Sequence, residues 1–393
     1  MTSRFLFTSE SVTDGHPDRL CDSISDAVVD RFLQKDPYSR IVAECALSKN
    51  VLFLAARFAT QANIDIPQVA RAVMGEVGYR EQDFDAANCS VLTSLIAMPQ
   101  EQRAQADERD LSPAELDRLT VHSQVSVFGY ACRQTPELMP LPISMANRLA
   151  NGLTRARQQR RLGYLSPDCT VQVGIEYHDN RPARVASITI VAGSVAGRPV
   201  DGAELRAHLL ADVIQPLFAD DPIQPDAASE IFVNPRGAFP KSGPGSHSGM
   251  TGRKTAADTY GAYARHSGSA LSGKDPSRVD RVGAYMARYA AKNVVAAGLA
   301  EECEVQLSYA IGHAGPISVR VQSFGSGTIA DADIGTRLRE AFDFRLGAII
   351  RDFDLRHLPA RHRPGFYQQL PIRGHMGHAD LPWERTDRAD SLR

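Results

Sequence analysis

The pattern that most restricts the fold is a β-hairpin followed by an amphipathic helix, which recurs along the 393-residue chain. Alternating apolar residues between turn residues predict the strands, and apolar residues at helical spacing predict the helices. Three copies at intervals of about 130 residues indicate a repeated α+β unit. No sequence identity is visible between the copies, so a coincidence of common elements stays open. The hairpins and their helices occupy residues 40–59 and 66–78, 171–194 and 205–218, and 305–325 and 334–344.

Composition sets the size of the protein and argues against two kinds of partner. The chain is 43% hydrophobic, which is enough apolar material for two or three domain cores. It carries 44 Lys and Arg against 46 Asp and Glu, a formal net charge of −2. This balance gives no support for binding to nucleic acid or to a membrane surface.

The cysteines and the apolar runs indicate the compartment. The six cysteines are scattered, with no C-x-x-C pair and no metal-ligand spacing, which is typical of reduced residues in a cytosolic protein. The N-terminus has no signal-peptide features, and no apolar run reaches the ~18–20 residues that span a bilayer. We therefore expect a cytoplasmic protein. The cysteines are Cys21, Cys45, Cys89, Cys132, Cys169 and Cys303.

The densest chemical signal is the segment 242–281, which is rich in glycine, lysine and arginine. Glycine lets backbone N–H groups approach an anion closely, and cationic side chains add charge-assisted bonds to phosphate oxygens. The segment is not a P-loop, because Asp275 follows Lys274 where that motif needs Ser or Thr. Composition alone leaves a flexible, solvated loop as an equal alternative.

A second cluster, at residues 10–18, precedes a helix predicted at 19–35. His16 lies between Gly15 and Pro17, on a turn at the helix N-terminus, where the helix dipole favours anions. Asp18 is a suitable ligand for a cation. A simple helix-capping turn is the alternative interpretation of this cluster.

Together these residues resemble the S-adenosylmethionine synthetases, also called methionine adenosyltransferases. The similarity covers nearly the whole chain in one order. The matching segments are FTSESVTDGHPDRLCDSISDAVVD at 7–30, FGYACRQTPELMPLPI at 128–143, TGRKTAADTYGAYARHSGSALSGKDPSRVDR at 251–281, YMARYAAKNVVAAGLA at 285–300, LSYAIG at 307–312 and GHMGHADLPWERTD at 374–387.

The resemblance implies an α+β fold of three interleaved α/β-sheet domains with pseudo-threefold symmetry. We expect the domains near residues 1–105, 118–238 and 239–393, with chain segments that interleave. The resemblance also implies a homodimer or a dimer of dimers, with active sites at the subunit interface, and the cofactors Mg²⁺ and K⁺.

The implied reaction is the attack of a nucleophile on C5′ of ATP. The whole triphosphate leaves and is then cleaved to pyrophosphate and phosphate. The residues carried over as catalytic are His16, Lys274 and Arg253; those for ATP and its triphosphate are Arg19, Arg253, Lys254, Lys274, Arg278, Phe239, Ile311 and Asp168. The residues carried over for metals are Asp18 and Asp280 for Mg²⁺ and Glu44 for K⁺.

The sequence departs from the family pattern in the pocket for the acceptor. Arg57 stands where the family has a glutamate that meets the substrate ammonium, and His247 stands where it has an aspartate. A cation opposite an ammonium group repels it, whereas each good charge-assisted bond contributes roughly 1.5–3 kcal/mol. The positions assigned to the acceptor pocket are Arg57, Met98, Ser123, Thr170 and His247.

These departures lead to a hypothesis about the acceptor and to two alternatives. We expect an adenosyltransferase whose acceptor is not free methionine, or whose acceptor presents an anion to Arg57. The first alternative is an ordinary methionine adenosyltransferase with compensating contacts. The second is a non-catalytic subunit that binds ATP or triphosphate and regulates a true synthetase.

Overall fold

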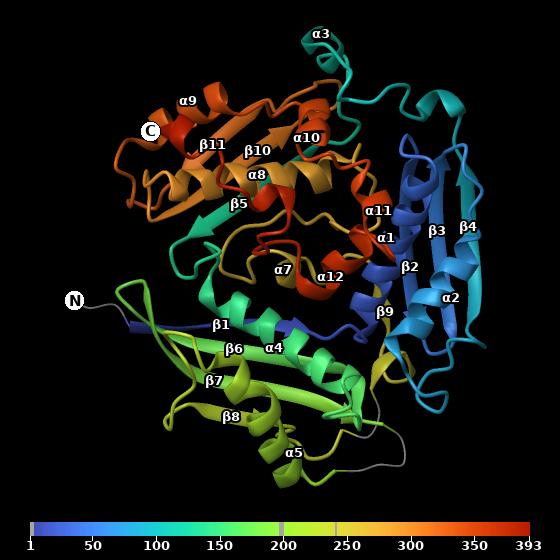
Figure 1. Cartoon of the computed structure of the whole chain (residues 1–393), viewed down its shortest axis with the longest axis vertical. Helices are drawn as coiled ribbons and strands as arrows, with labels where there is room; N and C mark the ends of the chain where they lie inside the picture. The colour runs from blue at the N-terminus through green and yellow to red at the C-terminus, as the bar shows by residue number, and fades with distance from the viewer. Residues whose placement is uncertain (1–3, 196–199, 240–241) are drawn as a thin grey trace.

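The computed structural model describes residues 4–195, 200–239 and 242–393, which form three β-sheets with helices packed against them (Figure 1). The first sheet has the strand order β4-β3-β2-β9. Helix α1 packs against β2 and against helix α2. The bounds are Arg40–Ser48 for β2, Val51–Ala59 for β3, Ser90–Ala97 for β4, Gly249–Met250 for β9, Pro17–Lys35 for α1 and Ile66–Val77 for α2.

The second sheet has the order β1-β6-β7-β8 and lies at the bottom of Figure 1. Its helices are α4, α5 and α6, and a π-helical turn at Leu210–Ile214 joins α5 to α6. The bounds are Arg4–Val12 for β1, Leu165–His178 for β6, Arg181–Ser194 for β7, Glu230–Val233 for β8, Leu141–Gln158 for α4, Gly202–Leu209 for α5 and Gln215–Phe218 for α6.

The third sheet has the order β11-β10-β5. Helix α8 packs closely against it: a Cβ added to Gly129 of β5 would lie 1.9 Å from a backbone atom of Ala287, so this contact requires glycine. The bounds are Val125–Cys132 for β5, Glu302–Tyr309 for β10, Ser318–Gln322 for β11, Val279–Ala296 for α8, Asp331–Ala341 for α9 and Leu346–Asp352 for α10.

Short helices connect these units. The α-helical ones are α3 at Pro113–Leu116, α7 at Thr255–Asp258, α11 at Leu358–Arg361 and α12 at Leu370–Arg373. Single 3₁₀ turns lie at Gln100–Gln102, Gly243–Gly245, Tyr367–Gln369, Pro382–Glu384 and Asp390–Leu392.

The structure confirms the three-sheet α+β fold and the repeated hairpin and helix. The hairpins are β2–β3, β6–β7 and β10–β11, and the helices that follow them are α2, α5–α6 and α9. The chain also interleaves, because β1 pairs with β6 and β9 pairs with β2 across long stretches of sequence. The exact domain boundaries stay a prediction.

Two hydrophobic cores hold the sheets. The larger core is continuous beneath the first and third sheets and includes apolar residues of α1 and α8. The smaller core lies between the second sheet and α4, α5 and α6. The first strand of the chain therefore belongs to a different core from the helix that follows it, and the turn at His16 joins the two.

Two charged segments, 103–118 and the residues after Trp383, are fastened to the fold. The segment 103–118 is anchored by Arg103, which makes hydrogen bonds of 2.6 and 2.8 Å to Asp36, and by Glu108, which accepts bonds of 2.6 and 2.7 Å from Arg356. Beyond Trp383 the chain is held by Leu392, which is fully buried. Hydrogen bonds and burial, which charge composition does not reveal, hold both segments.

Candidate active site

His16 lies in a tight turn that joins β1 to α1. The backbone N–H of Gly15 donates to Pro167 O at 3.2 Å, and the Tyr79 hydroxyl donates to Gly15 O at 2.5 Å. His16 caps α1, because its Nδ1 atom accepts the Asp18 backbone N–H at 3.2 Å. Burial lowers the pKa of His16 to about 4, so the ring is neutral near pH 7. A neutral ring bonded in this way leaves Nε2 as its hydrogen-bond donor.

Asp18 lies at the centre of a cluster of cations at the N-terminus of α1. Its Oδ2 atom accepts from Lys254 Nζ at 2.6 Å, its Oδ1 atom accepts from the Met250 N–H at 3.0 Å, and Arg253 lies 3.7 Å away. Burial raises the pKa of Asp18, but these hydrogen bonds outweigh it, so the pKa lies below its ordinary value. An ionised carboxylate of this kind suits Mg²⁺, which prefers oxygen ligands.

Asp168 and His247 form a hydrogen-bonded pair beside His16. Asp168 Oδ2 lies 2.8 Å from His247 Nε2 and accepts the Gly243 N–H at 2.7 Å. The hydrogen bond to Asp168 raises the pKa of His247. The rings of His16 and His247 lie 5.0 Å apart, edge to face. His247 and Asp168 therefore form a histidine–acid pair.

A second group of predicted residues lies near the start of α8. Lys274 Nζ is 4.0 Å from Asp280 Oδ1, and Arg278 is the N-cap residue of the helix. Burial lowers the pKa of Lys274, and the carboxylate of Asp280 partly opposes this effect. Gly273 has φ +77°, and a Cβ there would lie 2.0 Å from Ala43 O, so glycine is what brings this loop against β2.

Asp280 fits the metal role better than its neighbour Asp275. In the described chain the only ion pair of Asp280 is with Lys274, which leaves its carboxylate accessible. Asp275 is buried, and its two oxygens accept the backbone N–H groups of Ile41 and Ser277. The role of Asp275 is therefore to hold the loop.

Arg57 and Met98 line a cavity of about 390 Å³ together with Arg278. Arg40 and His122 complete its polar lining, and His122 lies 3.0 Å from Arg40. The side chain of Arg57 makes no hydrogen bond or ion pair within the described residues. Sequence reasoning missed Arg40 and His122, because neither lies in a local motif. Arg40 begins β2 and His122 lies just before β5, and only the packing of these two segments brings both residues to Arg57.

The five residues assigned to the acceptor pocket do not gather in one place within a single chain. Arg57 and Met98 lie near Arg278, in the group of residues around Lys274 at the start of α8, whereas His247 lies beside His16. Thr170 is on β6, opposite Val12 of β1. Ser123 is partly buried just before β5.

Three predicted nucleotide contacts have distinct surroundings. Arg19 is buried, and its guanidinium pairs with Asp258 and lies 3.8 Å from Asp22. Within a single chain these carboxylates surround its charge, and its role in triphosphate binding stays a prediction. Ile311 is 64% exposed, and Phe239 is partly buried next to the undescribed residues 240–241.

The two groups of site residues are separated along β2. Met250, which donates to Asp18, pairs with Ala46, whereas Lys274 bridges to Val42. Four residues of extended strand correspond to about 13 Å. Glu44, the predicted K⁺ ligand, lies between these positions and is exposed. No hydrogen bond or ion pair in the described residues joins the two groups.

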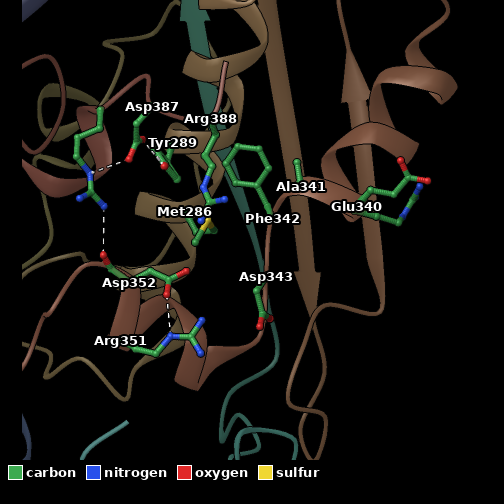
Figure 2. Close-up of a pocket in the computed structure, with 12 residues that line it drawn as sticks. Met286, Tyr289, Glu340, Ala341, Phe342, Asp343, Arg351, Asp352, Asp387 and Arg388 are labelled. Carbon is green, nitrogen blue, oxygen red and sulfur yellow. Dashed lines mark hydrogen bonds and ion pairs between the residues drawn. The ribbon is translucent and has the colours of Figure 1, made fainter. Parts of the chain in front are cut away.

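A cavity of about 620 Å³ elsewhere contains none of the predicted site residues (Figure 2). It lies between α8 and the C-terminal segment and is lined by charged residues of both signs. Arg351 pairs with Asp352 at 2.8 Å, and Tyr289 donates to Asp387 at 2.5 Å. The candidate site is therefore placed at the two groups along β2, which contain the predicted residues.

Comparison with known proteins identifies the family of the chain. Three family models match the chain: the S-adenosylmethionine synthetase N-terminal domain at residues 4–100, the central domain at 118–239 and the C-terminal domain at 242–385. The S-adenosylmethionine synthases of Synechococcus elongatus and Gloeobacter violaceus are each 45% identical, over 100% of this chain and 98% of their own length. That of Trichormus variabilis is 43% identical, over 100% of this chain and 97% of its length.

The fold, the site and these matches define a transferase of the methionine adenosyltransferase type. The chain belongs to the S-adenosylmethionine synthetase family.

Proposed function

We propose that this enzyme transfers the adenosyl group of ATP to methionine, which forms S-adenosylmethionine, and cleaves the displaced triphosphate to pyrophosphate and phosphate. The names of the relatives support methionine as the acceptor. The proposed binding of ATP rests on one observation. Arg253 and Lys254 lie beside the carboxylate of Asp18, and Lys274 lies beside that of Asp280. The names of these relatives favour the alternative of an ordinary synthetase over the hypothesis of a changed acceptor.

The proposed mechanism is a displacement at carbon. The sulfur of methionine has no proton to lose, so the protein has to align sulfur, C5′ and the leaving oxygen. The neutral His16 ring donates Nε2–H to the leaving oxygen, and Arg253, Lys254 and Lys274 stabilise the charge that grows on the triphosphate. Asp18 and Asp280 would hold Mg²⁺, which supplies further positive charge, and Glu44 would help to hold K⁺.

The exposed face of the first sheet supports the proposed homodimer, the unit from which a dimer of dimers would be built. Cross-strand pairing places Phe53 beside Leu92 and Arg57 beside Ile96. The large apolar side chains exposed on this face are Val51, Phe53, Leu92, Ile96 and Met250, whereas Leu95 points to the opposite face of β4. A contiguous apolar surface of this kind is typical of a protein–protein interface. A second copy would cover this surface and bring its own Lys274 group toward the His16 group of the first.

Phe53→Asp is expected to convert the dimer to a monomer and to lower turnover, because a charge is then buried in the interface and each site loses half of its groups. Light scattering coupled to size-exclusion chromatography measures the mass. Leu6→Asp is the matched control, since Leu6 is 57% exposed on β1, outside the first sheet. A Phe53→Asp dimer of unchanged stability contradicts this interface.

A second candidate function is transfer to an acceptor other than free methionine. Two observations favour it: Arg57 has no partner among the described residues, and His247 rather than a carboxylate faces Asp168. Both changes lower the negative charge that would hold an ammonium group. An acceptor that presents a carboxylate or another anion to Arg57 satisfies the cation.

Incubation of the protein with ATP, Mg²⁺ and K⁺, with and without methionine, separates the candidates. Mass spectrometry of the products is expected to show S-adenosylmethionine only when methionine is present. Triphosphate cleavage that requires a different acceptor, supplied by a cell extract, favours the second candidate. No cleavage with any acceptor leaves a non-catalytic nucleotide-binding subunit and contradicts both proposals.

Arg57→Glu is expected to change the KM for the acceptor by at least about tenfold and to leave the KM for ATP nearly unchanged, because one charge-assisted bond contributes roughly 1.5–3 kcal/mol. Steady-state kinetics with each substrate varied in turn measure both constants, and Arg57→Lys is the control that keeps the charge. A methionine KM that rises shows that Arg57 holds the methionine carboxylate. A methionine KM that falls shows that glutamate restores the family's ammonium site. A changed KM for ATP places Arg57 in the nucleotide half.

The proposed location is the cytoplasm. All six cysteines are free thiols, which fits a reducing compartment. No described helix is both long and apolar enough to cross a membrane.

A further inference from the structure

Three side chains from separate segments converge beside the first turn of α1. His16 comes from the turn before the helix, Asp168 from β6, and His247 from the segment after the 3₁₀ turn at Gly243–Gly245. One ring nitrogen of each histidine and one carboxylate oxygen of Asp168 all lie within 4.8 Å of one another. In the described chain this is the one group of histidine, cysteine and acidic side chains gathered so closely.

The donor atoms of this group differ from those of a magnesium site. Two imidazole nitrogens and one carboxylate suit late first-row divalent ions such as Zn²⁺, Co²⁺ and Fe²⁺, whereas Mg²⁺ prefers oxygen ligands throughout. Three protein ligands also leave coordination positions open for water or for an atom of a substrate. A ligand set of this composition is therefore distinct from the proposed Mg²⁺ ligands Asp18 and Asp280.

The backbone around the three residues is already ordered. Thr13 ties the turn to β6, because its N–H donates to Cys169 O at 3.0 Å and its Oγ1 donates to Pro167 O at 2.6 Å. The Gly243 N–H fixes Asp168, and the His247 N–H donates to Gly243 O at 3.1 Å. Hydrogen bonds to ligating side chains of this kind orient them toward a metal.

Metal binding needs only local adjustment. Ligand atoms about 2.0–2.2 Å from a tetrahedral ion lie roughly 3.4 Å apart. The hydrogen-bonded atoms of Asp168 and His247, now 2.8 Å apart, have to separate slightly, and the remaining separations, all within 4.8 Å, have to approach this value. The His247 side chain is 38% exposed and has room to turn, whereas His16 and Asp168 are nearly enclosed.

The surrounding charges partly balance an added cation. Lys254 and Arg253 oppose it, while the carboxylates of Asp18 and Asp168 favour it. The positive charge that is not neutralised by these carboxylates would attract the negatively charged triphosphate, which the proposed function brings to the same place.

We propose that His16, Asp168 and His247 form a site for one late first-row transition metal ion per chain. His247 supplies the second of the two nitrogen ligands, which is why the set favours such an ion over Mg²⁺. The inference does not depend on which acceptor the enzyme uses, and its test requires no turnover.

Titration of the chelator-treated full-length protein with Co²⁺ tests this site. Calorimetry is expected to give one ion per chain, and visible absorption bands of Co²⁺ are expected to report nitrogen ligands. His247→Ala and His16→Ala should each weaken Co²⁺ binding by about a hundredfold or more, because even the loss of an outer-shell partner commonly costs 10–100-fold. His266→Ala is the matched control, because His266 is exposed and bonds only to Ser267 O in the described chain.

Three outcomes overturn the proposal. The first is the absence of saturable Co²⁺ binding by the wild-type protein. The second is equal affinity in the His247→Ala and His266→Ala variants, each checked for folding by circular dichroism. The third is displacement of Co²⁺ by an excess of Mg²⁺, which would show that the ion occupies the oxygen ligands. His247→Asp provides a further check, since it keeps a ligand but removes a nitrogen, and it should weaken Co²⁺ binding and shift the absorption bands.

Discussion

Lys274→Ala is expected to lower turnover of ATP by about 10²–10³-fold, the usual loss when one group that stabilises developing charge is removed. The ammonium group lies 4.0 Å from Asp280 and is mostly enclosed, so it is held in one position without being tightly neutralised. Its loop is fixed to β2 by the hydrogen bond from the Ala43 N–H to Gly273 O at 2.8 Å, which the substitution leaves intact. We therefore expect little loss of stability. Release of triphosphate products and thermal unfolding measure the two effects.

Two variants show whether the charge of Lys274 is responsible. Lys274→Arg keeps the cation and should retain part of the activity. Lys35→Ala removes a lysine that contacts only Asn63 O in the described chain, and it should behave as the wild type. Full activity of Lys274→Ala, or a loss explained by unfolding, contradicts the role of this side chain in catalysis.

Glu384→Ala is expected to lower the free energy of unfolding by about 3–5 kcal/mol, because it removes the carboxylate that neutralises two buried cations. Glu384 is 3% exposed and accepts hydrogen bonds from Arg288 at 2.8 and 3.0 Å and from Lys292 at 2.8 Å. It also accepts the Gly377 N–H at 2.8 Å. Both cations lie on α8, so the carboxylate joins the central helix to the C-terminal segment. Urea unfolding at neutral pH measures the change.

The same carboxylate gives this contribution a defined pH dependence. Burial raises the pKa of Glu384, but Arg288 and Lys292 outweigh it and hold the pKa below the ordinary 4.5. A depressed pKa in the folded state stabilises the protein above the unfolded value, and this stabilisation is lost as the pH falls through the folded value. The difference between the wild type and Glu384→Ala should therefore shrink below about pH 4. Glu301→Ala, at an exposed ion pair of 3.7 Å, is the control, and an equal effect from the two variants would refute the prediction.

Local structure could be predicted from the sequence, whereas pairing between distant segments could not. The hairpin β2–β3 and the helix α2 follow from periodicity and turn residues within a short stretch. The two residues Gly249–Met250 form β9 only because β2 offers them an edge, and nothing in their own sequence indicates a strand. The interleaved arrangement followed from the family resemblance and not from periodicity.

The candidate site shows the same division. The segment 242–281 is a single cluster in the sequence, but β2 separates it into two groups, with Lys254 near Ala46 and Lys274 near Val42. The burial of Arg19 against Asp258 could not be predicted either, because charge alone does not distinguish a phosphate ligand from a structural ion pair. The roles of the residues in both groups stay predictions until the kinetic tests are made.

The pairing of β1 with β6 also constrains how the chain reaches its native state on the ribosome. Arg4 pairs with His178, and Cys132 pairs with Glu302, so in both pairs the second residue is synthesised long after the first. None of the three sheets can close until most of the polypeptide has been synthesised, so N-terminal segments stay without their partners for much of translation. Contacts between residues this far apart in sequence slow folding and leave unpaired strand edges exposed meanwhile. The nascent protein should therefore depend on chaperones until its last third emerges.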